Sequence, residues 1–281
     1  MNDSVYALLT AAAHQLASSS DTPRLDAEVL LAATLEQLRS ALYAWPERRV
    51  DAEQATRFAA WLHRRQGGEP LAYLLGQREF WSLELEVTPD TLIPRPETET
   101  LVELALTRLA DDAAIAIADL GTGSGAIALA LAVERPRARI VATDHSAAAL
   151  AVARRNAERL GLHRIVFRQG DWCAPLRRER LALIAANPPY IAATDPCWHY
   201  GALRFEPSTA LVGGVDGLDA IRTIIAQAPN HLQRNGWLVL EHGYDQGETV
   251  PTLLRQRGFQ AVSDHQDAAG VSRVSCGRWP A

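Results

Sequence analysis

The 281-residue sequence contains no lysine, so all 28 of its basic residues are arginine. The formal net charge is -5 at pH 7. A protein whose affinity depends on neutralising many nucleic-acid phosphates needs clustered basic residues. Short runs such as Arg64-Arg65 and Arg177-Arg178 form no such stripe, and we interpret them as solvated faces. We therefore expect no stable nucleic-acid binding, while a local contact stays open.

Cysteine is also scarce. Cys173, Cys197 and Cys276 are odd in number and widely spaced, so they predict neither a disulfide framework nor a metal site. The eight histidines are scattered, and none is spaced as a metal-binding or catalytic pair. The sequence also lacks a signal peptide and any run of about 18 apolar residues that could span a bilayer. We expect a cytoplasmic protein that binds neither metal nor membrane.

Helical periodicity dominates the first part of the chain. Apolar residues recur at helical spacing from Val5 to about Leu75. Residues 67–70, Gly-Gly-Glu-Pro, interrupt this pattern, and residues 80–87 alternate as the half-buried strand of a hairpin does. We therefore predict a small helical domain with a connecting hairpin over residues 1–87 and a second domain over residues 88–281.

The second domain alternates apolar strand-like runs with helical runs. This alternation predicts an α/β fold, with a mainly parallel sheet covered by helices on both faces. The last strand is expected to pair antiparallel with its predecessor across a short turn. The predicted strands are residues 114–118, 139–143, 165–168, 181–186, 237–241, 259–263 and 271–276.

A glycine-rich loop follows the first predicted strand of this domain. Residues 119–125 read Asp-Leu-Gly-Thr-Gly-Ser-Gly and open a helix. Glycines let a backbone turn sharply and approach a ligand closely, so a nucleoside cofactor is indicated. Gly121, Gly123 and Ala126 also satisfy the dinucleotide fingerprint, and a purely structural turn is a further alternative. Asp119 favours S-adenosylmethionine, because an anion there opposes a pyrophosphate and attracts an ammonium group.

Two further strand ends carry candidate cofactor contacts. Asp144 ends the second strand and is placed to accept hydrogen bonds from both ribose hydroxyls, or alternatively to cap the helix that follows. Asp171-Trp172 follows the third strand, where a carboxylate and an aromatic ring suit an adenine base. A tryptophan that only fills the core is the alternative at Trp172.

The tetrapeptide Asn187-Pro188-Pro189-Tyr190 follows the fourth strand and is the most specific feature of the sequence. By average residue usage it arises by chance in roughly one chain in a thousand of this length. The Asn187 side-chain oxygen and the Pro188 carbonyl can accept the two N–H groups of a planar nitrogen, freeing its lone pair for methylation. Two fixed φ angles keep these acceptors rigid. Tyr190 is positioned to pack on the planar target, unless the prolines simply end a strand and Tyr190 fills the core.

Together these segments resemble the protein-(glutamine) methyltransferases that modify peptide chain release factors. The resemblance covers nearly the whole chain. Its narrower motifs are Ile-Pro-Arg-Pro-Glu-Thr-Glu at residues 93–99, Arg-Phe-Glu-Pro at 204–207 and Leu-Glu-His-Gly at 240–243. The resemblance implies a Rossmann-like class I methyltransferase sheet, joined by a β-hairpin to a small helical domain that docks the release factor.

The resemblance also implies a reaction and a set of site residues. The reaction is methyl transfer from S-adenosylmethionine to the side-chain amide nitrogen of the glutamine in the Gly-Gly-Gln loop of class I release factors. The substrate glutamine would be cradled by Asn187, Pro188, Pro189 and Tyr190. The residues implied to bind the methyl donor are Gly121, Thr122, Gly123, Ser124, Gly125, Asp144, Trp172 and Asn187.

Three rival functions stay open at this level. An adenine-specific DNA or RNA N-methyltransferase meets the same geometric demand at its target nitrogen, and base flipping delivers such a base. A nicotinamide-dependent oxidoreductase uses the same loop but leaves the tetrapeptide at 187–190 unexplained. A binding module that has lost the chemistry is the third rival, against which the intact loop and Asn187 argue.

Overall fold

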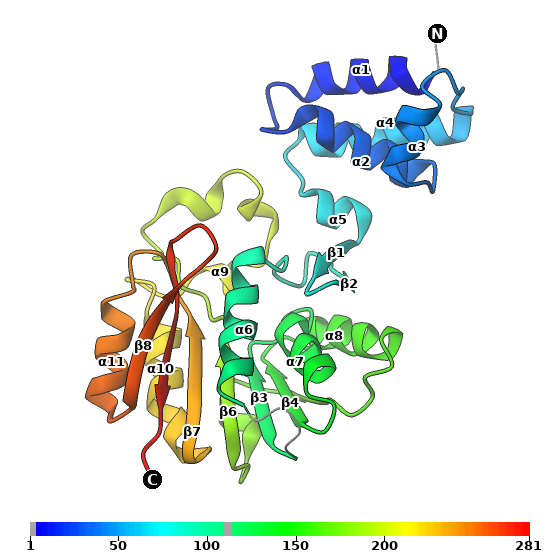
Figure 1. Cartoon of the computed structure of the whole chain (residues 1–281). Helices are drawn as coiled ribbons and strands as arrows, with labels where there is room; N and C mark the ends of the chain where they lie inside the picture. The colour runs from blue at the N-terminus through cyan, green and yellow to red at the C-terminus, as the bar shows by residue number, and fades with distance from the viewer. Residues whose placement is uncertain (1–3, 110–113) are drawn as a thin grey trace. The chain divides into compact units, whose positions relative to one another are not determined.

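The computed structural model describes residues 4–109 and 114–281. The chain divides into two compact units between Gln77 and Arg78 (Figure 1). The sequence predicted this boundary about ten residues later, after the hairpin. The hairpin falls with the second unit because Phe80 and Leu85 are buried in that unit's hydrophobic core.

The first unit is helical, as predicted, and its helices are α1 (Val5–Leu16), α2 (Pro23–Thr34), α3 (Arg39–Ala44), α4 (Ala52–Gln66) and α5 (Leu71–Leu75). Its own apolar core includes Leu9, Leu30 and Phe58. Helix α4 begins at a capping box, in which Asp51 accepts from the Gln54 backbone and the Gln54 side chain accepts from the Asp51 backbone.

A two-stranded hairpin, β1 (Gln77–Phe80) and β2 (Leu83–Glu86), precedes the larger sheet. Trp81 and Ser82 form its turn with φ of +54° and +56°. Two successive left-handed residues are what a type I′ hairpin turn requires. Asn156 fixes β2 to the second unit, because its side chain accepts from the Glu86 N–H and donates to the Glu86 carbonyl.

The second unit is built on a seven-stranded sheet with the order β5-β4-β3-β6-β7-β9-β8. All its neighbouring strands pair parallel except β9, which is antiparallel to both β7 and β8. The predicted α/β class and the antiparallel last strand are therefore confirmed. The strands are β3 (Ala116–Leu120), β4 (Arg139–Asp144), β5 (Val166–Gln169), β6 (Leu181–Ala186), β7 (Leu232–Glu241), β8 (Gln260–Gln266) and β9 (Ser272–Arg278).

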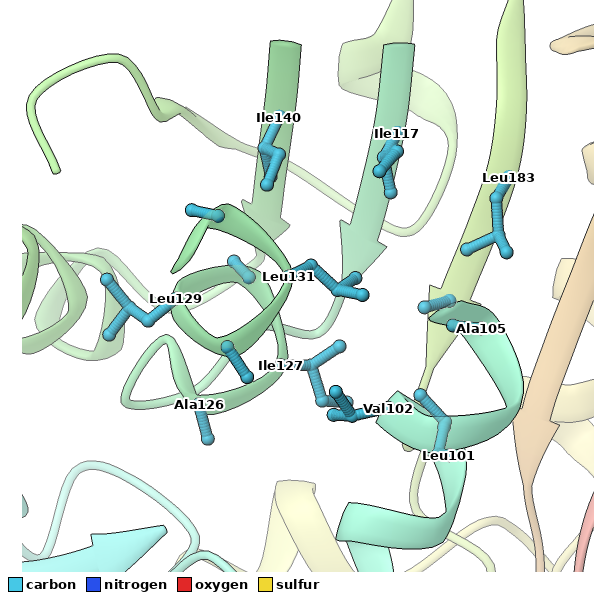
Figure 2. Packing of buried hydrophobic residues seen from close by; sticks show 14 of the residues in the cluster. Leu101, Val102, Ala105, Ile117, Ala126, Ile127, Leu129, Leu131, Ile140 and Leu183 are labelled. Carbon is cyan, nitrogen blue, oxygen red and sulfur yellow. The ribbon is translucent and has the colours of Figure 1, made fainter. Parts of the chain in front are cut away.

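Helices cover both faces of this sheet. The helices are α6 (Glu99–Thr107), α7 (Ala126–Glu134), α8 (Ala147–Arg159), α9 (Ser208–Leu211), α10 (Asp219–Gln227) and α11 (Thr249–Arg257). On one face, side chains of α6 and α7 pack against Ile117, Ile140 and Leu183 of three adjacent strands (Figure 2). The alternate strand residues, such as Ile184, pack with α10 and α11 on the other face. Strands buried on both faces explain why the sequence shows continuous apolar runs.

The parallel strands β3, β4, β5 and β6 end at one edge of the sheet, which gathers the loops that follow them. In the described part of the chain, no helix has both the length and the apolar character needed to cross a membrane. The same residues contain no cluster of histidine, cysteine or acidic side chains able to hold a metal ion.

Candidate functional site

A cavity of about 490 Å³ lies at the carboxyl edge of the sheet. Its volume is in the range of small-molecule and cofactor sites. Segments far apart in the sequence line it: the residues before α6, the loops after β3, β4, β5 and β6, and the region around α9. The lining residues are Pro89, Asp90, Thr91, Leu92, Gly121, Gly123, Asp144, His145, Ser146, Ala149, Gly170, Asp171, Trp172, Asn187, Pro189, Pro207, Thr209, Ala210 and Val212.

The glycine-rich loop after β3 contributes backbone rather than side chains to this cavity. The N–H groups of Gly121 and Thr122 donate to the Thr143 carbonyl at 2.8 and 2.9 Å, which holds the loop against the end of β4. Gly123 has φ of +56°, and a Cβ built there would meet no atom within 4 Å. The Gly123 backbone therefore lies open to a ligand that approaches closely.

Asp119 braces this loop from within the core. Its Oδ2 accepts from Thr122 Oγ1 at 2.5 Å and from the Ala128 N–H at 3.1 Å. The side chain is fully buried, and burial raises the pKa of Asp119 to about 7. Asp119 does not line the cavity, so it braces the loop from behind, and any attraction of an ammonium group would act without direct contact.

Asp144 lines the cavity with its side chain partly committed to the protein. Its Oδ2 accepts from the Gly123 N–H and its Oδ1 from the Ser146 N–H, both at 2.9 Å. The cap of α8 is Ser146, whose side chain accepts from Ala149 N, so Asp144 is not the helix cap. A carboxylate offers about four acceptor positions, and about half of those on Asp144 remain for a ligand.

Trp172 lies at the boundary between core and cavity. Its ring packs partly against the core of the α10–α11 face and also lines the cavity, so it does more than fill the core, and its contact with an adenine stays a prediction. Thr143 Oγ1 donates to the Trp172 carbonyl at 3.1 Å, which ties the loop after β5 to the end of β4. Asp171 is exposed beside it.

The tetrapeptide after β6 is divided between cavity and core. Asn187 and Pro189 line the cavity, whereas Pro188 is buried. The Tyr190 ring packs against the core of the α10–α11 face, and its hydroxyl lies 3.4 Å from Glu241 Oε1. Burial raises the pKa of Tyr190 above its ordinary value, so this hydroxyl keeps its proton.

The backbone of this tetrapeptide is held by the segments before α10 and α11. Gln246 Nε2 donates to the Tyr190 carbonyl at 3.1 Å. A Cβ built on Gly217 would lie 2.2 Å from that same carbonyl oxygen. Only glycine permits so close an approach, and the acceptor groups at 187–190 are therefore rigidly placed.

The structure separates the sequence-predicted site residues into two groups. Those that line the cavity are Gly121, Gly123, Asp144, Trp172, Asn187 and Pro189. Thr122 and Ser124 are buried and bonded to their surroundings, Thr122 to Asp119 and Ser124, through its carbonyl, to Asn156. Gly125, Pro188 and Tyr190 are not among the residues that line the cavity.

Two residues beside Asn187 were not predicted from the sequence. Thr98 Oγ1 accepts from Asn187 Nδ2 at 3.1 Å, and Glu241 lies beside the Tyr190 hydroxyl. Thr98 and Glu241 are 4% and 1% exposed. Both belong to segments singled out by the family resemblance, 93–99 and 240–243, but nothing in the local sequence pairs them with Asn187.

The segments at 93–99 and 204–207 are joined by a hydrogen bond and an ion pair. Glu206 is buried and accepts from the Ile93 N–H at 3.0 Å, and it forms an ion pair with Arg95. Two motifs separated by more than a hundred residues therefore form one joint beside the cavity.

The charged side chains of the cavity lining are acidic. Asp90, Asp144 and Asp171 contribute carboxylates, and no arginine occurs among the described residues that line the cavity. A pyrophosphate placed here would face these carboxylates without an arginine to pair with it. The lining suits a ligand that carries positive charge and no phosphate.

Comparisons with known proteins agree with this geometry. Residues 7–76 match the PrmC N-terminal domain, and residues 98–198 match the methyltransferase small domain. A methyltransferase structure from Pyrococcus furiosus has the same fold, with a TM-score of 0.54 and 18% identity over 81% of this chain and 100% of that one.

Full-length relatives are much closer. The release factor glutamine methyltransferase of Pseudomonas aeruginosa is 54% identical over 92% of this chain and 94% of its own length. That of Coxiella burnetii is 50% identical over 94% of this chain and 95% of its own length. With such identity over nearly all of both proteins, the chain belongs to the release factor glutamine methyltransferase family.

Proposed function

We propose that this protein transfers a methyl group from S-adenosylmethionine to the side-chain amide nitrogen of a glutamine in a peptide chain release factor. The glutamine is the one in the Gly-Gly-Gln loop that the family resemblance implies. The observation that carries the proposal is the convergence of Asn187 and the Gly121–Gly123 backbone on one acidic cavity. Membership of the family supports the same substrate.

The cavity residues fit the methyl donor. Asp144 retains acceptor positions for two ribose hydroxyls, Trp172 offers a ring face for the adenine, and Asp171 is available to its amino group. The backbone at Gly121 and Gly123 allows close approach of the part of S-adenosylmethionine beyond its ribose and adenine. When bound, S-adenosylmethionine supplies an electrophilic methyl group on a positively charged sulfur, which the carboxylates of the lining stabilise.

Asn187 and Pro188 then activate the substrate nitrogen. An amide nitrogen is a poor nucleophile because its lone pair is delocalised. Asn187 Nδ2 is committed to Thr98, so Oδ1 is the atom left to accept a substrate N–H. The Pro188 carbonyl accepts the second N–H, and the two hydrogen bonds orient the lone pair. No strong base is needed, since the nitrogen becomes acidic once it is alkylated.

Tyr190 and Pro189 complete the proposed glutamine cradle. Pro189 lines the cavity and gives the substrate amide an apolar wall. Tyr190 is half-buried, with its hydroxyl toward Glu241, which leaves part of its ring for packing against the planar amide.

The N-terminal unit is proposed to dock the release factor. It carries large side chains that are more than half exposed, and they are Tyr6 (63%), Leu38 (79%), Tyr43 (60%) and Trp45 (55%). Exposed aromatic residues of this kind are enriched in protein interfaces. Trp45→Ala should raise the KM for the release factor and leave the affinity for S-adenosylmethionine unchanged.

The free cysteines suit the cytoplasm, where translation ends.

The test is mass spectrometry of a purified release factor incubated with the enzyme and S-adenosylmethionine. We expect one added methyl group, on the peptide that contains the Gly-Gly-Gln loop. Labelled methyl donor offered with DNA, RNA and release factor together tests the rivals. Label in a nucleic acid and none in the release factor would establish an adenine methyltransferase. Tight binding of NAD without binding of S-adenosylmethionine would establish an oxidoreductase.

Asn187→Ala separates catalysis from folding. It should abolish turnover while the affinity for the methyl donor falls only modestly. Asn230→Ala is the matched control, because Asn230 is exposed and does not line the cavity. Unchanged turnover in Asn187→Ala would contradict the proposed mechanism.

A further inference from the structure

A buried polar cluster lies directly behind Asn187. Ala186 pairs with Leu240 in the parallel register of β6 and β7, so Asn187 and Glu241 follow at the same level of the sheet. Thr98 Oγ1 accepts from Asn187 Nδ2 at 3.1 Å, and its hydroxyl, placed to donate to the Glu241 carboxylate, lowers the pKa of that group. Thr98 and Glu241 are both shielded from water.

Burying the Glu241 carboxylate at this place costs free energy of folding. Burial raises its pKa to about 7, although the Thr98 hydrogen bond, the charge of Arg273 and the Tyr190 hydroxyl lower it in part. Its Oε2 has no hydrogen-bond partner among the described residues. A buried carboxylate that is incompletely satisfied destabilises a fold. Its presence beside Asn187 therefore points to a role in the site.

The direction of the hydrogen bonds defines that role. An ionised carboxylate only accepts, so Thr98 donates its single hydroxyl hydrogen to Glu241 while that residue is ionised. The Thr98 oxygen can then only accept from Asn187. The amide of Asn187 is consequently oriented with Nδ2 toward Thr98 and Oδ1 away from it. In the opposite orientation, N–H groups would face the N–H groups of a substrate amide.

We propose that Thr98 and Glu241 are positioning residues, which fix the orientation of the Asn187 amide so that Oδ1 faces the substrate nitrogen. The proposal rests on the proposed function for its substrate. It predicts that Thr98 and Glu241, which do not contact the substrate, control the catalytic rate by setting the rotation of the Asn187 side-chain amide.

Isosteric variants test this arrangement. Thr98→Val removes both hydrogen bonds and keeps the shape, and Thr98→Ser restores the hydroxyl. Glu241→Gln can donate to Thr98, which allows the Thr98 hydroxyl to donate to Asn187 Oδ1 and the Asn187 amide to turn over. Thr34→Val is the matched control, because Thr34 is a fully buried threonine in the N-terminal unit.

We expect Thr98→Val and Glu241→Gln to lower kcat by up to about a hundredfold, since a displaced group in an active site costs on this order. The KM for the release factor and the affinity for S-adenosylmethionine should change less than about threefold. Thr98→Ser should recover most of the activity. Glu241→Gln should unfold at an equal or higher temperature than the wild type, because it removes a buried charge.

Two results would overturn the proposal. One is a wild-type kcat in Thr98→Val or Glu241→Gln. The other is a Thr98→Val variant that loses stability and methyl-donor affinity together with kcat, with no recovery in Thr98→Ser, which would indicate a purely structural role.

A measurement without turnover keeps this test separate from the choice of substrate. The side-chain NH2 resonances of Asn187, assigned by their loss in Asn187→Ala, should exchange slowly with water in the wild type and quickly in Thr98→Val. Equal exchange rates would refute the Thr98 bond even if the release factor is methylated. Slow exchange in a protein that methylates only nucleic acid would refute the proposed function and leave the positioning role intact.

Discussion

The buried carboxylate of Asp119 should make the stability of the protein depend on pH in a defined direction. Burial raises its pKa from 3.8 to about 7. The folded state therefore holds a proton that the unfolded state releases, and the free energy of unfolding falls as pH rises between these two values. The difference of about three pKa units corresponds to about 4 kcal/mol. Between about pH 5 and pH 8 the group contributes about 3 kcal/mol of this change.

Asp119→Asn isolates this contribution. Asparagine keeps an oxygen that can accept from Thr122 and Ala128, and it has no titrating proton. Wild type should lose about 3 kcal/mol more stability than Asp119→Asn when the pH is raised over that window. Glu241 titrates in both proteins, so its effect cancels in the comparison.

Urea unfolding at a series of pH values, followed by circular dichroism, measures the difference. Asp21→Asn is a suitable control, because Asp21 is exposed in the N-terminal unit. Its curve should run parallel to that of the wild type. If Asp119→Asn also loses stability in parallel with the wild type, Asp119 is ionised in the folded protein and the argument from burial fails.

Three further substitutions test other parts of the structure. Gly123→Ala forces a residue with a side chain into the left-handed region, at a strain of about 1 kcal/mol, and directs a methyl group into the cavity. Calorimetry should show about tenfold weaker binding of S-adenosylmethionine. Unchanged affinity would contradict the assignment of this cavity to the methyl donor. Glu206→Gln removes the charge that pairs with Arg95. Chemical denaturation should show a loss of about 2 kcal/mol in the free energy of unfolding, which is less than for a fully buried pair because Arg95 is about one-third exposed. Leu129→Ala opens a void in the fully buried α7 packing and should cost about 2–5 kcal/mol in the same measurement; a loss below 1 kcal/mol would show that the core closes around it.

The sequence predicted the sheet well where burial dictates the pattern. Strand β6 is apolar throughout because both of its faces are covered, and its predicted and observed bounds coincide at Leu181–Ala186. Strand β7 begins five residues before the prediction, at Leu232, because its first part is largely exposed and polar. The insertion of β9 between β7 and β8 was not predicted, since strand order depends on long-range pairing that local periodicity does not encode.

The site was predictable to the extent that it follows strand ends. Asp144 and Asn187 lie on one cavity because parallel strands end at one edge. Their functional roles remain predictions. The contact between Thr98 and Asn187 spans 89 residues, and no motif at either end specifies the other. Side-chain hydrogen bonds of this kind arise from the tertiary fold, so sequence patterns cannot supply them.

The position of β9 also bears on how the protein is made. A ribosome synthesises β7 and β8 before the strand that separates them, so their backbone edges stay unpaired until residues 272–278 emerge. Unpaired edges are templates for aggregation, and incomplete chains expose them. A truncation before Ser272 should therefore leave β7 with an open edge and give an insoluble product, although every residue of the cavity lining is present. Strand β9, made after both of its neighbours, therefore completes the sheet.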